Sequence, residues 1–135
     1  MTAMTNRERS QRPRADGPFP GLRSVPPVGP AILSLRDGLD FGAASALRER
    51  LLDVLRRRPD LLILDLSGTH TCDVAGLAVL IGTQRRARLL GIAMRLVAPS
   101  LAVRRVLRST GLDRSFTICP DLSGALAAEP RSAAA

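Results

Sequence analysis

The chain has 135 residues, 45% of them hydrophobic, which is enough for one domain with a real core and too short for two ordinary domains. Three phenylalanines are the only aromatic residues, all 20 basic residues are arginine, and one histidine accompanies two cysteines; these counts disfavour a base-stacking surface and exclude lysine chemistry, a zinc finger and a multi-bridge disulfide scaffold. The net charge of +8 is divided between a proline-rich N-terminal segment and a mildly basic remainder of mixed sign, which favours solvated helix faces over a specific nucleic-acid interface.

The two ends of the chain lack the periodic apolar pattern of packed elements. Residues 1–28 contain five prolines and five arginines, and residues 130–135 are mostly alanine and serine. Such segments bury too little apolar surface to offset the entropy lost on ordering them. We therefore predict a disordered tail over 1–28, one domain over 29–129 and a second disordered tail over 130–135.

The first half of this domain alternates strand and helix patterns. A short apolar run over 31–36 predicts a strand, and Asp40 stands where it can cap the helix that follows. Leucines that recur every four residues predict an amphipathic helix over about 43–58, which ends before Pro59. The nearly continuous apolar run over 61–66 predicts a strand buried on both faces.

The second half repeats this alternation. Asp73 can cap a helix over about 75–90, whose stripe we assign to Leu77, Leu80, Ile81, Gln84 and Ala87, together with Arg88. A strand over 92–97, a helix between Ser100 and Gly111, a short strand over 116–119 and a last helix capped by Asp121 follow. This order predicts an α/β fold, a mixed and mostly parallel sheet of four or five strands with about four helices.

The most informative stretch runs from Leu64 to Leu77, where a buried strand leads through a polar loop into the helix that begins at Asp73. The first turn of a helix carries unpaired N–H groups and the positive end of the helix dipole, which favour a phosphate or an acidic partner. Gly76 leaves one face of this turn without a side chain, so we expect the backbone of a partner to approach there.

This stretch resembles the STAS family, the sulfate transporter and anti-sigma factor antagonist domain. The family pattern is an apolar strand, then D-L-S-G, about four residues, and D-S-x-G-L at a helix start. The chain has Asp65-Leu66-Ser67-Gly68 and Asp73-Val74-Ala75-Gly76-Leu77 in these places. Further segments over 37–40, 95–100 and 103–113 match in order and spacing, so the resemblance covers about 31–128.

The resemblance implies a protein-interaction module rather than an enzyme. Free-standing bacterial members are typically anti-sigma factor antagonists: each binds an anti-sigma factor, often a serine kinase, and frees a sigma factor for transcription. The kinase switches the antagonist off by phosphorylating the serine after the motif aspartate, because the phosphoryl group brings about −1.5 to −2 charge into the interface. The chain has Val74 at that position and Ala75 after it, so we expect binding to carry over without this switch.

The surface predicted to bind the partner is the motif loop and helix start, with the first capping aspartate beside it. Its residues are Asp40, Thr69, Thr71, Asp73, Val74, Ala75, Gly76, Leu77 and Leu80. Thr71 and Thr69 are also the nearest hydroxyl groups that could serve as a displaced phosphosite. Asp40 and Asp73 are equally well explained as helix N-caps, each stabilising the fold by about 1 kcal/mol.

Other residues with chemical potential have structural explanations. His70 has no second histidine or carboxylate at a metal-binding or catalytic spacing, and Ser67 suits a turn beside Gly68. Cys72 and Cys119 are better explained as small buried thiols than as a redox pair. We therefore predict no catalytic residue, no metal site and no cofactor.

One alternative keeps the same domain with a different partner, as the small STAS subunit of an ABC-type membrane lipid-transport complex. Neither role needs membrane insertion. No apolar run in the chain approaches the roughly 20 residues that span a bilayer. The N-terminus also lacks an apolar signal segment. We therefore expect a cytoplasmic protein, with its oligomeric state left open.

Overall fold

The computed structural model describes residues 29–127, and the predicted tails over 1–28 and 130–135 lie outside this range. The strands are β1 (Pro30–Ser34), β2 (Leu61–Asp65), β3 (Ala93–Val97) and β4 (Thr117–Cys119). The α-helices are α1 (Ala44–Arg56), α2 (Val74–Leu89), α3 (Leu101–Thr110) and α4 (Leu122–Ala127). Two short 3-10 helices, η1 (Phe41–Ala43) and η2 (Leu112–Arg114), precede α1 and follow α3.

The four strands form one sheet in the order β1-β2-β3-β4, and each neighbouring pair is parallel. One register row joins Ile32, Ile63, Arg95 and Thr117 across the sheet. The predicted α/β class is confirmed, with every pairing in the described sheet parallel rather than mixed. Because parallel strands end at the same edge, the loops after β1, β2 and β3 all gather there.

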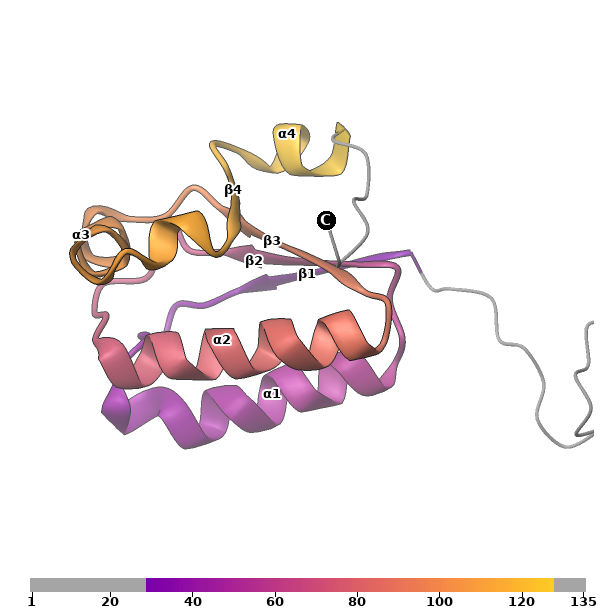
Figure 1. Ribbon diagram of the computed structural model, residues 1–135, viewed down its shortest axis with the longest axis horizontal. Coiled ribbons are helices and arrows are strands. Elements are labelled where there is room, and N and C mark those ends of the chain that lie inside the picture. The colour runs from indigo at the N-terminus through magenta and orange to yellow at the C-terminus, as the bar shows by residue number, and fades with distance from the viewer. Residues whose placement is uncertain (1–28, 128–135) are drawn as a thin grey trace, which may run out of the picture.

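Helices α1 and α2 lie side by side over one face of the sheet (Figure 1). The predicted leucine stripe of α1 is buried there, at Leu47, Leu51 and Leu55. Helix α2 packs against both α1 and β3, so its buried surface is wider than one stripe. Val79 and Thr83 are buried as well, whereas Ile81 and Gln84 are only half-buried, which corrects the predicted stripe.

Helix α4 lies on the opposite face, over β3 and β4 (Figure 1). It completes a smaller apolar cluster made of Leu61, Ile63, Val97, Cys119 and Ala125. Arg95 projects into the same face and is 3% exposed. Its Nη1 donates a hydrogen bond to the carbonyl oxygen of Ala125. A buried guanidinium group therefore ties β3 to α4.

The predicted helix caps are confirmed by hydrogen bonds. The side chains of Asp40, Asp73, Ser100 and Asp121 accept from the backbone N–H groups three residues ahead. Gly111 ends α3 with a φ of 75°, a left-handed conformation that favours glycine. These local signals fix where the helices begin and end.

Candidate functional site

Two loops at the carboxyl edge of the sheet are joined by backbone hydrogen bonds. Leu39, in the loop after β1, donates its N–H to the carbonyl oxygen of Thr71 at 2.8 Å. The N–H of Asp73 donates back to the carbonyl oxygen of Leu39 at 2.9 Å. The pair Leu39 and Cys72 thereby forms an isolated parallel bridge beyond the strands. The starts of η1 and α2 are held together as one unit.

Two aspartates strengthen this junction by each bonding to both loops. The carboxylate of Asp73 accepts from the N–H of Gly76 in its own helix and from the N–H of Phe41, both at 3.0 Å. The carboxylate of Asp40 accepts from the N–H of Ala43 at 3.0 Å and from the hydroxyl of Thr71 at 2.6 Å. The Thr71 and Ala43 bonds stabilise the charged form and lower the pKa of Asp40.

Gly76, in the first turn of α2, lies directly against the backbone of the loop after β1. A Cβ atom at this position would lie 1.9 Å from the carbonyl oxygen of Leu39 and 2.8 Å from the N atom of Asp40. Gly76 is buried, and the backbone that approaches it belongs to the same chain. The prediction that a partner's backbone packs against Gly76 is therefore wrong.

Three further members of the predicted partner surface are buried side chains. Thr69, Leu77 and Leu80 are each 0% exposed. The Thr69 hydroxyl donates to the carbonyl oxygen of Leu35 at 2.5 Å, so it is committed to the loop and is not presented to a kinase. Leu77 and Leu80 belong to the apolar core. These three residues and Gly76 are buried, so they have a structural role and are not the partner contacts that the sequence predicted.

The remaining predicted residues form a partly exposed surface together with one residue that sequence reasoning missed. We call it the tip surface; its residues are Asp40, Phe41, Thr71, Asp73, Val74 and Ala75. Phe41, Thr71 and Val74 are exposed, and Asp40, Asp73 and Ala75 are half-buried. Phe41 is 80% exposed and Val74 is 64% exposed. Phe41 precedes the leucine repeat of α1, so that repeat does not point to it. A large apolar residue directly after a capping aspartate is the signal that could have revealed it.

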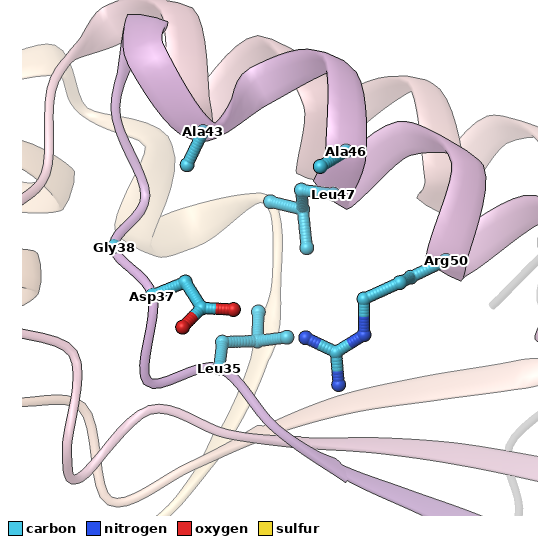
Figure 2. A pocket seen from close by; sticks show the side chains of 7 residues that line it. All are labelled: Leu35, Asp37, Gly38, Ala43, Ala46, Leu47 and Arg50. Carbon is cyan, nitrogen blue, oxygen red and sulfur yellow. The ribbon is translucent and has the colours of Figure 1, made fainter.

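A small pocket lies beside the tip surface, between the loop after β1 and helix α1. Figure 2 shows its lining side chains, with Asp37 and Arg50 pointing toward it from the loop and the helix. Its volume is about 40 Å³. That is room for about one water molecule, far below the roughly 300 Å³ of an ordinary small-molecule site. This pocket is therefore too small for a small-molecule ligand.

The start of α3 is attached to the same junction. The hydroxyl of Ser100 donates to the carbonyl oxygen of Thr69 at 2.6 Å, and the N–H of Ser100 donates to the carbonyl oxygen of Leu66 at 3.2 Å. Figure 1 accordingly shows α3 at the same end of the molecule as the starts of α1 and α2. The start of α3 and the tip surface therefore lie at the same end of the molecule.

The two cysteines lie on opposite sides of the sheet. Cys72 packs against the core beneath α1 and α2, whereas Cys119 belongs to the cluster on the opposite face. Burial, followed by the charges of Asp73 and Asp40, raises the pKa of the Cys72 thiol to about 11. His70 is exposed. Among residues 29–127 no three histidine, cysteine or carboxylate side chains are grouped to hold a metal ion.

No helix in the part of the chain that the structure describes is long and apolar enough to cross a membrane.

Comparison with known proteins gives a consistent assignment. The family model for the STAS domain matches residues 22–125. The chain is 31% identical over 100 residues to the anti-sigma-F factor antagonist RsfB of Mycobacterium tuberculosis, covering 73% of this chain and 80% of RsfB. The crystal structure of an anti-sigma factor antagonist from Mycobacterium paratuberculosis shares 32% identity with a TM-score of 0.66, over 73% of this chain and 84% of that one. The anti-sigma factor antagonist SpoIIAA, solved in its unphosphorylated form, is 18% identical with a TM-score of 0.59, over 74% of this chain and 88% of that one, and supports the fold alone.

Proposed function

Because the chain belongs to the STAS domain family, we propose that it is an anti-sigma factor antagonist, which binds an anti-sigma factor and frees the sigma factor held by it. The relatives reported above are named as anti-sigma factor antagonists and give no support to the alternative role in a lipid-transport complex. The tip surface is the contact region in this proposal, and the role is binding rather than catalysis.

Two exposed apolar side chains support this assignment of the contact region. Phe41 and Val74 stand at the starts of η1 and α2, which the Asp73 carboxylate fixes relative to each other. The Asp73 carboxylate already holds the Phe41 backbone, so little backbone entropy is lost on binding, and burying the side chain contributes about 2 kcal/mol. The carboxylate oxygens of Asp40 and Asp73 beside them already accept hydrogen bonds from N–H and hydroxyl groups of the junction itself. In this proposal, apolar contact is therefore the main source of binding affinity.

The binding test compares two exposed apolar residues, Phe41 at the start of η1 and Leu89 at the last position of α2. The Phe41→Ala variant removes the tip contact, and Leu89→Ala truncates a residue that is 87% exposed at the far end of α2. With an anti-sigma factor from the same genome, we expect Phe41→Ala to weaken binding about 30-fold and Leu89→Ala less than about twofold. Equal affinities of the two variants would remove the tip surface from the interface.

The functional test is release of a sigma factor from its preformed complex with the anti-sigma factor. We expect the chain to release the sigma factor in proportion to the amount added, and the Phe41→Ala variant to need about 30 times more. Failure of the unmodified chain to bind any of the anti-sigma factors of its genome would refute the proposed function itself.

We further propose that the partner is a serine kinase that cannot switch this antagonist at position 74. The Val74 side chain has no oxygen to accept a phosphoryl group, and it is exposed at the first residue of α2. Thr71 is exposed, but its hydroxyl already donates to Asp40, whose negative charge would repel a phosphoryl group there. Thr69 is withdrawn from the surface, as described above.

Intact-mass measurement after incubation with the kinase and ATP tests the lost switch. We expect no added phosphoryl group on the unmodified chain and one on Val74→Ser, which restores a hydroxyl beside Asp73. Val74→Asp supplies the charge directly, and an acidic side chain in the first turn suits the helix dipole, so the fold is retained. We expect Val74→Asp to bind at least about tenfold more weakly, because its charge must be desolvated in the interface. A phosphoryl group mapped to Thr71 of the unmodified chain would show that the switch has moved.

A further inference from the structure

One face of α3 carries a group of arginines that the proposed contact region does not use. Leu101, Arg104, Arg105, Arg108 and Ser109 line a shallow hollow of about 310 Å³. All five residues are exposed, and Leu101 is 53% exposed. We call these five residues the arginine face.

In the part of the chain that the structure describes, the charges on this face have no acidic partner. Helix α3 contains no carboxylate, and Arg104 and Arg108 stand one turn apart, where like charges destabilise a helix by a few tenths of a kcal/mol. Within residues 29–127 no ion pair joins Arg104, Arg105 or Arg108 to an acidic side chain. In contrast, Arg56 of α1 pairs with Asp53 at 2.6 Å. An acidic group from outside would therefore find three guanidinium groups available.

Hydrogen bonds of Ser100 link the start of α3 to the loop that leads into α2. Ser100 caps α3 through the N–H of Val103 and holds the loop before α2 through the carbonyl oxygen of Thr69. Leu101, the first residue of α3, follows directly at the edge of the hollow. A protein docked on Phe41 and Val74 therefore has the start of α3 at the same end of the molecule.

We propose that the arginine face binds an acidic segment of the same protein partner, with carboxylates on Arg104 and Arg108 and an apolar side chain on Leu101. This inference rests on the proposed function for the identity of the partner. Arginine binds carboxylates through paired hydrogen bonds, and residues 104 and 108 are about 6 Å apart along the helix, a spacing that carboxylates one helical turn apart would match.

An acidic protein segment fits this face better than a nucleic acid does. Leu101 adds an exposed apolar contact, which a phosphate backbone cannot cover and a peptide side chain can. Residues 29–127 also contain nine carboxylates against fourteen arginines, so the domain lacks the broad positive field typical of nucleic-acid binders.

The experiment compares two double charge reversals that change the net charge equally. Arg104→Glu/Arg108→Glu alters the arginine face, and Arg85→Glu/Arg86→Glu alters two exposed arginines of α2, whose sequence also lacks carboxylates. Association with the anti-sigma factor is measured at low and high salt, with circular dichroism to verify the fold. We expect the first variant to associate at least about tenfold more slowly at low salt and the second less than about threefold, with the difference shrinking as salt rises.

The Phe41→Ala variant separates the two proposals. If Phe41→Ala weakens binding while Arg104→Glu/Arg108→Glu behaves like the α2 control, the arginine face is not part of the interface and this inference is overturned alone. If the unmodified chain binds no anti-sigma factor, the proposed function fails as well. A duplex DNA that binds through Arg104 and Arg108, with anti-sigma association indifferent to them, would also overturn the inference in favour of a nucleic-acid contact.

Discussion

Replacing Gly76 by alanine tests the junction on which the whole tip surface depends. The new Cβ would lie 1.9 Å from the carbonyl oxygen of Leu39, whereas carbon and oxygen atoms ordinarily approach to about 3.3 Å. The loop after β1 must therefore retreat by more than about 1 Å. Both contacting atoms are backbone, so no rotation of a flexible side chain can relieve the clash.

The expected loss of stability follows from the contacts that this retreat breaks. Overpacking at a tight contact costs about 1–3 kcal/mol. The hydrogen bond from the Asp73 N–H to Leu39 contributes about 1 kcal/mol more. Alanine returns about 1 kcal/mol through its higher helix propensity. We expect Gly76→Ala to lower the free energy of unfolding by about 1–3 kcal/mol, which is a fall of about 5–20 °C in Tm for a domain of this size.

Gly82 provides a matched control on the same helix. A Cβ at Gly82 would meet no atom within 4 Å, and this glycine is exposed. Gly82→Ala should therefore gain about 0.5–1 kcal/mol from helix propensity alone. Urea unfolding followed by circular dichroism measures both variants. A Gly76→Ala variant as stable as Gly82→Ala would refute the close approach to Leu39 and the junction derived from it.

Three further outcomes are expected. Arg95→Ala removes the buried donor to Ala125, so it should lower the free energy of unfolding by about 2–4 kcal/mol and speed amide hydrogen exchange in α4. Unchanged exchange in α4 would contradict the role of Arg95 in holding α4 to β3. The pKa of Asp40 is lowered in the folded state, so its contribution to stability is present above its ordinary pKa of 3.8 and is lost as the pH falls through the lower folded value. The Asp40→Asn variant should therefore show a flatter acid limb in a curve of stability against pH. An unaltered acid limb would count against the Thr71 bond. With its pKa raised to about 11, Cys72 should react with iodoacetamide at pH 8 about 100-fold more slowly in the folded chain than in urea, and rapid labelling before unfolding would disprove its burial.

Several features of the site were predictable because they depend on neighbouring residues. Asp40 and Asp73 cap helices through bonds to N–H groups three residues ahead, a distance fixed by helix geometry. Val74 was placed at the first turn of α2 by counting from Asp73. The family resemblance then assigned this turn to partner binding, and the relatives confirm the family.

Other features could not be read from the chain because they depend on contacts between distant segments. Asp73 lies 32 residues from Phe41, yet its second oxygen accepts the Phe41 N–H. Gly76 looked like an open surface for a partner, since a missing side chain has the same appearance in sequence whether the approaching backbone is external or internal. Thr69 looked like a spare hydroxyl until the carbonyl oxygen of Leu35 was found beside it.

The amino-acid sequence by itself determined the order of elements, their caps, the α/β class and the absence of a hydroxyl at position 74, because period, capping chemistry and residue identity are local properties. Only the tertiary structure decided which residues of the motif face outward. It buried Thr69, Gly76, Leu77 and Leu80 and left Phe41 and Val74 exposed. The physical reason is that exposure depends on how the loops after β1 and β2 pack against each other, and no spacing along one segment encodes the position of the other.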